Sequence, residues 1–451
     1  MNNALLFWLV FIIVLLALLC QTKPKWLRKL LTSKTKSKSN PKPQVYRPKS
    51  EKDCPCCQAA LAHSIPASPE CQHAHLVPWE QIKGKGGPTK TICTEGYFCS
   101  KSSCRYYAIS DQTIHALVGY GQQDEKKSIQ DLFCQACKTK FTCRKHTPLY
   151  RLKTKPDTVG QAMHMLVLGA TISMAEEILH VRESTVRTWL ARSGEHGRKL
   201  HNHFFKNLEL THLQLDELWA NVKHDQQDVW LWTVCDAKTK LIPVIQLGPR
   251  TLAMAYAVVH ELISRLKAGC VPAFSSDGLR HYFSALTAHF GEWVPIEGQK
   301  KPVWMVLSDF HYAQVIKMRK RLRVVDVEQR FIWGSPVAYR SRLKAAGLSG
   351  NINTAFVERA NLTIRQSVSK LARRTWASAQ YSSELFEHIY WWLAYYHFSR
   401  YHESLRIPLK QPTRRKGRQR PIRYRRCTPA MAAGLTRRHW SIMDLLSYPL
   451  L

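Results

Sequence analysis

Three acidic side chains stand where metal-dependent chemistry is common. Asp216 lies in the segment LQLDELW, Asp277 in FSSDG and Glu358 in NTAFVERANLTIRQ. The first two segments are predicted strands and the third is a predicted helix. Two divalent ions held by three such carboxylates can cut and rejoin a phosphodiester bond. Singly, a strand aspartate is more often a surface or turn residue and a helical glutamate an ion-pair partner, but the order and contexts together favour metal binding.

The segment with Asp216 begins a run of three predicted antiparallel strands. HLQLDELWANV alternates, so Gln214 and Asp216 share one face of the first strand. DVWLWTVCDAKTKLIPVIQLG has the pattern of two further strands joined by a tight turn at 236–239. A helix is expected at 251–267, followed by a short buried strand that ends at Asp277. A crossover of this kind would bring Asp277 beside Asp216 at the edge of the sheet.

Glu358 depends on a predicted helix, which Asn353 or Thr354 would cap. Positions i, i+3, i+4 and i+7 share one helical face, and they hold Glu358, Asn361, Leu362 and Arg365. Glu358 can therefore reach a metal while Arg365, two turns along, meets a phosphate. Further positive charge for binding DNA comes from Arg359, Lys370, Arg373 and Arg374.

Cysteines gather in one region: ten of the fourteen lie between Cys54 and Cys143. Close pairs of this kind indicate metal binding in a reducing compartment. The predicted four-thiolate zinc ribbon joins Cys134 and Cys137, which have two residues between them, with Cys99 and Cys104. The alternative is a set of buried free thiols. A second zinc site would draw on Cys54, Cys57, Cys71 and one of Cys93, His73 and His75.

Three helical stretches are predicted within residues 156–200. Apolar residues at helical spacing mark the first two: Val159, Met163, Leu166 and Val167, then Ala175, Ile178 and Leu179. A short turn at 180–182 leads to a third helix, and residues 183–192 of it have the character of a recognition helix. The alternative is an ordinary three-helix connector. The side chains expected to contact DNA are Ser184, Thr185, Arg187 and Thr188.

The chain has 451 residues and a formal net charge of +35. This excess favours a polyanionic partner, because lysine and arginine neutralise phosphates and release counterions. Solubility charge and affinity for a membrane surface are the alternatives, but the excess far exceeds the charge of about 2–8 that keeps a small domain soluble. Nucleic acid is therefore the expected partner.

Residues 1–20 form a largely apolar, uncharged leader. Its residues 4–20 fall at the short end of a membrane-spanning helix, and the basic stretch that follows would keep the rest of the chain in the cytoplasm. A signal peptide fits less well, since residues 1–3 carry no positive charge and no small-x-small cleavage site follows. The competing interpretation is an upstream start codon that adds a segment unrelated to the working protein.

The chain resembles the DDE transposases of the insertion-sequence-one type, in a branch with a zinc ribbon and a helix-turn-helix fused in front. The resemblance covers about residues 90–440 and is carried by DELW at 216–219, WLW at 230–232, SDG at 276–278, the run 358–374 with ER, NLTIRQ and LARR, and TPAMAAGL at 428–435. The 81-residue interval between Asp277 and Glu358 departs from compact members, which implies an insertion at about 281–350. Trp293, Trp304 and the basic stretch 317–323 would form a small DNA-gripping subdomain there. The leader is the second departure.

The resemblance implies an α/β protein with a ribonuclease-H-like catalytic core behind a zinc ribbon and an all-α helix-turn-helix domain. Asp216 would bridge two magnesium ions, with manganese a workable substitute, while Asp277 and Glu358 would each hold one. Arg365 would orient or neutralise a phosphate. The implied partners are double-stranded DNA, both at the element's terminal repeats and at the target, and further copies of the chain assembled on that DNA.

Composition and motifs divide the chain into the leader (1–20), a basic linker (21–52), a cysteine-rich zinc region (53–150), the helix-turn-helix (156–200), the catalytic domain (208–405) and a basic tail (406–451). Three other functions share parts of this pattern. A nuclease or junction resolvase would cut DNA with the same carboxylates and leave it unjoined. A non-enzymatic regulator would use only the zinc ribbon and the helix-turn-helix, and a membrane-attached protein would present a basic cytosolic face.

Overall fold

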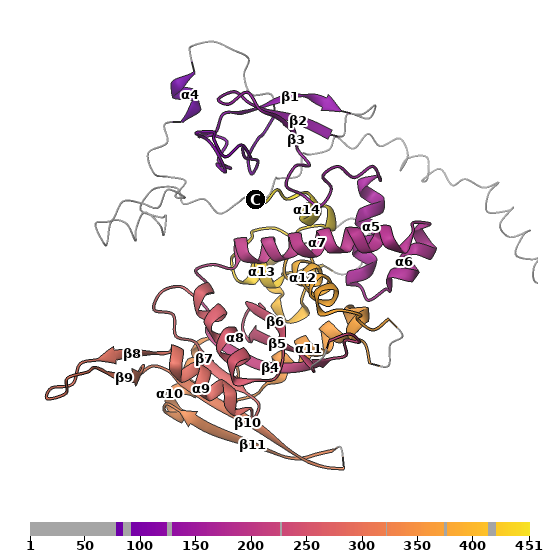
Figure 1. Ribbon diagram of the computed structural model, residues 1–451. Helices are drawn as coiled ribbons and strands as arrows, with labels where there is room; N and C mark the ends of the chain where they lie inside the picture. The colour runs from indigo at the N-terminus through magenta and orange to yellow at the C-terminus, as the bar shows by residue number, and fades with distance from the viewer. Residues whose placement is uncertain are drawn as a thin grey trace, which may run out of the picture. The chain divides into compact units, whose positions relative to one another are not determined.

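The computed structural model describes residues 78–83, 92–123, 129–225, 228–321, 323–373, 377–413 and 421–451 (Figure 1). All of them belong to one compact unit, Pro43–Leu451. The leader, the linker, Arg374 and every ligand named for the second zinc site except Cys93 lie outside these ranges. Within them, no helix combines the length and apolar character needed to cross a membrane.

A mixed six-stranded sheet of order β11-β10-β7-β4-β5-β6 carries two of the three acidic residues. The predicted run of three antiparallel strands is confirmed, since β4 pairs antiparallel with β5 and β5 with β6. The predicted parallel neighbour is also present, because β7 pairs parallel with β4, and β10 extends the sheet parallel to β7. The strands are His212–Ala220 (β4), Val229–Asp236 (β5), Val244–Gly248 (β6), Ala273–Ser276 (β7), His311–Lys320 (β10) and Arg323–Trp333 (β11).

Helices pack on both faces of β4, whose side chains alternate as predicted. Gln214 and Asp216 hydrogen-bond to residues of α11 on one face. Glu217 turns to the other face, toward the Tyr282 hydroxyl of α9. The central strand β5 is buried over most of its length, which suits its continuous apolar run. The helices around the sheet are α8 (Leu252–Arg265), α9 (Arg280–His289), α10 (Pro336–Ala345) and α11 (Ala355–Ser367).

Two β-hairpins occupy the predicted insertion between Asp277 and Glu358. One is formed by β8 (Gly291–Val294) and β9 (Val303–Val306), the other by β10 and β11. Both extend away from the helices around the sheet (Figure 1). The β10–β11 hairpin is the longer. The start of β10, residues 311–315, is buried, whereas residues 323–327 of β11, near the hairpin turn, are exposed.

Three helices follow one another in the predicted helix-turn-helix region: α5 (Pro156–Val167), α6 (Ile172–Leu179) and α7 (Glu183–Phe204). Thr171 caps α6 by accepting a hydrogen bond from Met174 N at 3.2 Å, and His180 ends it in the left-handed conformation with φ of 54°. Of the apolar stripe predicted for the second helix, Ala175 is buried, but the Ile178 side chain is 62% exposed. Helix α6 is short, and the face that buries Ile172 and Ala175 leaves Ile178 about 90° to one side.

Helix α7 continues well past the predicted recognition segment and packs closely on α12 (Ser382–Phe398). Two glycines allow this approach. A Cβ atom on Gly194 would lie 2.4 Å from Glu387 O, and one on Gly197 would lie 2.5 Å from Tyr390 O. A side chain at either position would collide with α12, so the two glycines let the predicted helix-turn-helix region pack directly against α12.

One hydrophobic core joins these regions. It runs without interruption from Leu149, through the helices α5 to α7 and the sheet, to Leu450. The end of the predicted basic tail contributes to it, because Trp440, Leu445 and Leu446 are buried against the other helices. The elements of this end are β12 (Ile407–Thr413), β13 (Ile422–Arg425), α13 (Pro429–Ala432) and α14 (Ile442–Ser447), with short 3₁₀ turns at Ser369–Leu371 and Glu403–Leu405.

The cysteine region has a small core of its own. Its elements are α4 (Trp79–Ile82) and a three-stranded antiparallel sheet of β1 (Leu117–Gln123), β2 (Ile129–Cys134) and β3 (Lys140–Thr142). Leu117, Leu132 and Phe141 pack there with three of the cysteines. So few buried apolar side chains give little stability, and small domains of this kind usually need a metal or disulfides.

The α7–α12 contact makes Gly194→Ala a sharp test of the fold. In an open helix this change adds roughly 1 kcal/mol of stability. Here the new methyl group must push α12 away, so we expect the free energy of unfolding to fall by about 1–3 kcal/mol, as measured by chemical denaturation. Gly278→Ala is the matched control, because its nearest neighbour would be Ile316 at 3.8 Å. Equal stability of the two variants would contradict the packing described.

Candidate functional site

The parallel pairing of β4 with β7 brings the two aspartates together. Leu215 lies opposite Ser276 in this pairing, so Asp216 and Asp277 follow at adjacent positions of neighbouring strands. Asp277 lies just beyond the end of β7, where its Oδ1 accepts a hydrogen bond from Leu279 N at 3.0 Å. Strand β7 therefore places Asp277 at the edge of the sheet, and the turn after the strand fixes its side chain.

Helix α11 is fixed to the same strand by Gln214, a fully buried side chain. Its Oε1 accepts hydrogen bonds from Phe356 N (2.9 Å) and Val357 N (3.0 Å), two backbone groups that have no partner within the helix. Its Nε2 donates to Asn353 O at 2.8 Å. Glu358 is the next residue of the helix, so Gln214 sets the position of its backbone relative to β4.

A second contact lies one turn further along α11. Asn361 Nδ2 donates to Asp216 Oδ2 at 2.9 Å, and Arg365 Nη2 donates to the carbonyl oxygen of Trp219 at 3.5 Å. The predicted face of Glu358, Asn361 and Arg365 therefore does turn toward the strand of Asp216. Asn361 Oδ1 is buried and has no hydrogen-bond partner among the described residues. It is thus an oxygen next to Asp216 that a hydrated or directly bound hard cation could satisfy.

The electrostatics of Asp216 indicate crowded negative charge. Burial, then the field of Asp277, raises the pKa of Asp216 to about 6, with a smaller contribution from Glu358 and an opposing one from Asn361. The Asp277 and Glu358 side chains are 41% and 42% exposed. The group thus has one half-buried carboxylate behind two that reach solvent, and a divalent cation would reduce the repulsion among them.

Two cations counter this charge. Arg250 Nη2 lies 3.0 Å from Glu217 Oε2 and 3.8 Å from Asp277 Oδ2. Lys317, from β10, donates to Glu358 Oε1. Glu217 is itself almost completely buried, and burial together with Asp277 raises its pKa to about 7. Arginine and lysine therefore supply positive charge where divalent ions would otherwise supply it.

The three carboxylates do not form a single-ion site. Among the described residues, only the four cysteines form a group of three or more His, Cys, Asp or Glu side chains whose ligand atoms all lie within 4.8 Å of one another. A two-ion site has looser demands. Ions about 3.5–4 Å apart, each about 2.1 Å from its oxygens, allow the outer ligands to be separated by up to about 8 Å. The donor set of carboxylates and an amide oxygen fits magnesium or manganese in such a site.

The side chains predicted to contact DNA differ in how available they are. Ser184, Thr188, Arg359 and Arg373 are exposed, and Thr185 is partly buried. Arg187 is exposed but lies 3.3 Å from Glu183 Oε2 and 3.7 Å from Glu384 Oε2. Lys370 is buried and ion-paired with Glu384 at 2.9 Å, so its charge is neutralised inside the protein. Arg374 lies outside the described residues.

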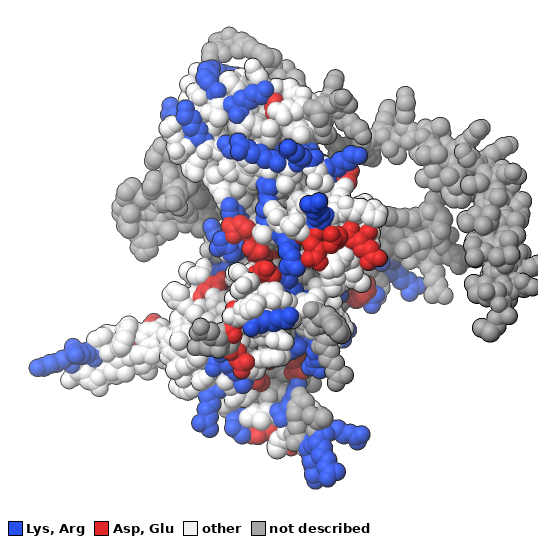
Figure 2. All heavy atoms as spheres, turned by 45° about the vertical axis from the view of Figure 1, so that its right-hand side comes forward, with Lys and Arg blue, Asp and Glu red and all other residues white. Residues whose placement is uncertain are grey.

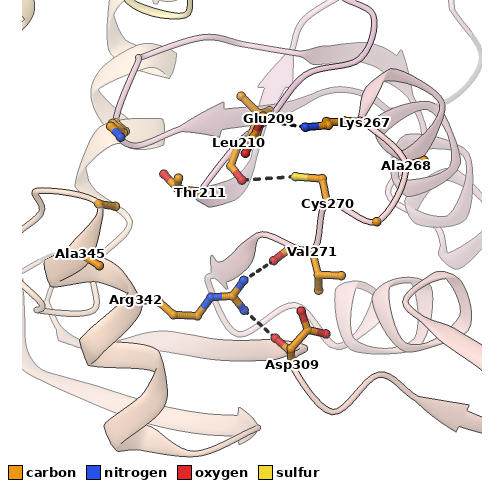
Figure 3. Close-up of a pocket in the computed structure, with 13 residues that line it drawn as sticks. Glu209, Leu210, Thr211, Lys267, Ala268, Cys270, Val271, Asp309, Arg342 and Ala345 are labelled. Carbon is orange, nitrogen blue, oxygen red and sulfur yellow. Dashed lines mark hydrogen bonds and ion pairs between the residues drawn. The ribbon is translucent and has the colours of Figure 1, made fainter. Parts of the chain in front are cut away.

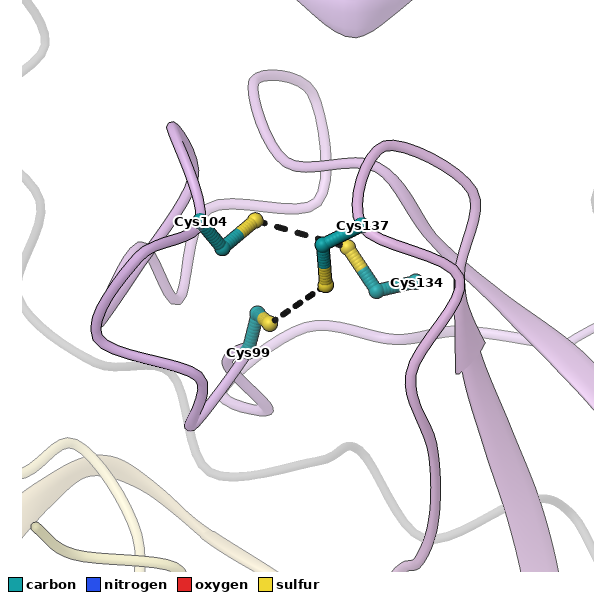
Figure 4. Close-up of side chains that lie close together, drawn as sticks. All are labelled: Cys99, Cys104, Cys134 and Cys137. Carbon is teal, nitrogen blue, oxygen red and sulfur yellow. Dashed lines mark hydrogen bonds between the residues drawn. The ribbon is translucent and has the colours of Figure 1, made fainter.

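The predicted cluster of four thiols is confirmed. Cys99 and Cys104 lie on one loop, while Cys134 and Cys137 lie at the end of β2 and the turn after it (Figure 4). The Sγ atoms of Cys99 and Cys137 are 3.5 Å apart, and those of Cys104 and Cys134 are 3.8 Å apart. A zinc ion about 2.3 Å from each of four sulfurs holds them about 3.8 Å apart. The cluster can therefore bind zinc with little rearrangement.

Backbone geometry around the thiols fits the same ligand. Lys138, just after the second cysteine of the pair, has a φ of 60°, and its amide donates to Cys134 O at 2.8 Å. Tyr106 N donates to Cys104 Sγ at 3.4 Å. The Cys99 thiol donates toward Cys134, which lowers the pKa of Cys134 to about 5 and raises that of Cys99. One thiolate is thus stabilised even before a metal displaces the remaining protons.

A pocket at the other end of the strands has a different character (Figure 3). Most of its lining residues precede β4 or β7, and two of its cations, Arg342 and Lys267, already have partners. Arg342 donates to the carbonyl oxygens of Val271 (2.7 Å) and Asp309 (2.6 Å), and Lys267 pairs with Glu209 at 3.3 Å. Arg342 therefore joins α10 to the sheet and is not free to recognise a ligand.

Removing one zinc ligand provides the first test of this site. We expect Cys137→Ser to lose one equivalent of bound zinc and to unfold the region around β1–β3, because a hydroxyl is a poor zinc ligand and the local core is small. Zinc content by elemental analysis and hydrogen exchange of the region would measure this. Cys143→Ser is the control, since Cys143 is outside the cluster. Unchanged zinc in Cys137→Ser would contradict the assignment.

The raised pKa of Asp216 gives a prediction about stability and pH. A carboxyl group whose pKa is higher in the folded state contributes stability at low pH that is lost as pH rises through the folded pKa. Asp216→Asn should therefore raise the free energy of unfolding at pH 8 in magnesium-free buffer by of order 2 kcal/mol. The gain should shrink as pH falls toward about 4, near the ordinary pKa of aspartate. A gain that is the same at both pH values would contradict the crowding of charge at this site.

Magnesium should stabilise the native chain against thermal unfolding and have a much weaker effect on Asp216→Asn.

Comparison of the chain with protein-family models and with curated proteins gave no match. Its function is therefore inferred from the chemistry of the two side-chain clusters.

Proposed function

We propose that the chain is a DNA transposase of the DDE type, which binds the ends of a DNA element, cuts a phosphodiester bond and joins the freed end to a target. The observation that carries the proposal is the approach of Asp216, Asp277 and Glu358 from β4, β7 and α11. The sheet supports a ribonuclease-H-like core, because three antiparallel strands are followed by parallel neighbours beside the first.

Each side chain then has a distinct role. Asp216 would bridge two magnesium or manganese ions, with Asp277 and Glu358 each holding one. Such ions, when bound, activate the attacking oxygen and stabilise the charge on the leaving oxygen. Asn361 orients Asp216 through its hydrogen bond. Arg365, on the same helix face, would neutralise a phosphate of the bound strand.

DNA binding is assigned to the helix-turn-helix α5–α7 and to the basic surface. Ser184 and Thr188 are exposed at the start of α7, where a recognition helix contacts DNA. The net charge of +35 supports a polyanionic partner. The zinc ribbon would bind DNA alongside these helices. Assembly of several copies on DNA, in the cytoplasm, follows from the same proposal.

The decisive experiment separates joining from cutting. A pre-cleaved element end with a free 3′-hydroxyl is incubated with target DNA and magnesium, and joined products are resolved by electrophoresis. We expect joining by the native chain and a loss of at least about 100-fold in Asp216→Asn, Asp277→Asn and Glu358→Gln. Affinity for DNA should stay within about threefold, because these carboxylates contribute repulsion rather than attraction.

The control for folding is Glu209→Gln, which removes an exposed acid at the other end of β4. It should leave joining unchanged. Cleavage without joining by the native chain would favour a nuclease or junction resolvase. If all three substitutions leave every activity of the protein intact, none of these activities depends on the carboxylates, and the protein would be a DNA-binding regulator instead.

A further inference from the structure

The outer half of the β10–β11 hairpin, residues 317–327, is a surface that packing does not explain. We call it the distal ribbon. Most of its described side chains are exposed, including Val324 (45%), Val325 (61%) and Val327 (47%), while Lys317 at its base is partly buried. A two-stranded ribbon without support on either face is only marginally stable in water. An extension of this kind is therefore expected to have a partner.

Charge in the distal ribbon identifies the kind of partner. It contains a single acidic residue, Asp326, against five cations: Lys317, Arg319, Lys320, Arg321 and Arg323. Lys320, Arg321 and Arg323 are exposed and have no acidic partner among the described residues. The positive charge gathers at the end of the ribbon, the lowest point in Figure 2. A polyanion is the complementary surface.

Arg321, at the tip of the ribbon, is held in a strained conformation. Its φ is 46°, in the left-handed region that favours glycine or asparagine in a tight hairpin turn. Glycine would fold this turn more easily, so the arginine is not explained by stability. Strained residues of this kind are concentrated at binding and catalytic sites.

The base of the ribbon lies at the candidate active site. Gln314 of β10 pairs with Ser276, the residue before Asp277. Lys317 begins the distal ribbon and donates to Glu358. From Lys317 to the tip, about four residues at about 3.3 Å each span about 13 Å, the length of about four base pairs. A polyanion held at the tip would therefore continue across the carboxylates.

We propose that the distal ribbon is an arm that grips double-stranded DNA beside the catalytic carboxylates. Exposed arginines at its tip contact phosphates, and the ribbon has the width that a major groove admits. When DNA and divalent ions bind, Lys317 leaves Glu358 for the phosphate backbone. The position of the DNA over the carboxylates rests on the proposed function, whereas DNA binding by the arm does not.

Arg321→Gly tests the arm without loss of folding, because glycine relieves the strained turn. The probe is duplex DNA of about 40 base pairs, titrated by fluorescence anisotropy in magnesium-free buffer at salt concentrations of about 50 to 200 mM. We expect the Kd to rise about three- to tenfold and the slope of log K against log salt to fall by about one. Thermal stability should stay the same or increase. Arg321→Gly with Arg323→Ala should reduce the slope by about two.

Lys300→Ala with Lys301→Ala is the matched control. It removes two exposed charges from the other projecting hairpin, whose loop also carries Glu297. Its effect on Kd should be less than about twofold. Equal effects in both hairpins would overturn the proposal, because net charge alone would then account for binding. So would an unchanged Kd in the ribbon variants.

Two further measurements separate other causes. Binding to phosphatidylserine vesicles that falls in the ribbon variants while DNA binding persists would overturn the proposal in favour of a membrane surface. If the native chain fails to join DNA while the ribbon variants still lose affinity for duplex DNA, the proposed function is wrong and the DNA-binding role of the distal ribbon is supported. If joining and Kd are both intact in the ribbon variants, the arm fails and the function stands.

Discussion

Two amide side chains hold in register a strand and a helix that lie far apart in the sequence. Gln214 bonds to backbone groups of α11 that are 142 and 143 residues away, and Asn361 bonds to Asp216 at a separation of 145. Both glutamine and asparagine are buried, so breaking either contact would leave polar groups without water. The relative position of Asp216 and Glu358, and with it any shared ion, depends on these bonds.

Electrostatics works against this geometry. The fold places Asp216, Glu217, Asp277 and Glu358 in a small region, and the raised pKa values of Asp216 and Glu217 are the result. Arg250 and Lys317 reduce the repulsion in the metal-free chain. If the proposed divalent ions bind, they would replace these side-chain cations at carboxylates that the fold already holds close together. Such local destabilisation is common where a site must bind a charged ligand.

Much of this arrangement follows from local pattern. Alternation predicts β4, the turn at 236–239 predicts the β5–β6 hairpin, and cysteine spacing predicts the thiol cluster. What could not be predicted depends on tertiary neighbours. Arg250 meets Glu217 across 33 residues, and Lys370 loses its charge to Glu384 inside the protein. Ile178 is exposed because the short helix α6 turns Ile172 and Ala175 toward the core instead. The position of Gln214, two residues before Asp216 and on the same face of the strand, was the one signal in the sequence that it could help to hold α11.

The glycine contact between α7 and α12 has a mechanical consequence. Helix α7 is a single rod of 22 residues, about 33 Å long at about 1.5 Å per residue, close to one turn of B-form DNA. Its first two turns carry the exposed hydroxyls of Ser184 and Thr188, and its middle packs tightly on the part of the protein that bears the carboxylates. If DNA binds at those turns, the rigid helix would hold the scissile bond at a constant spacing from the recognised bases, because no flexible joint lies between them.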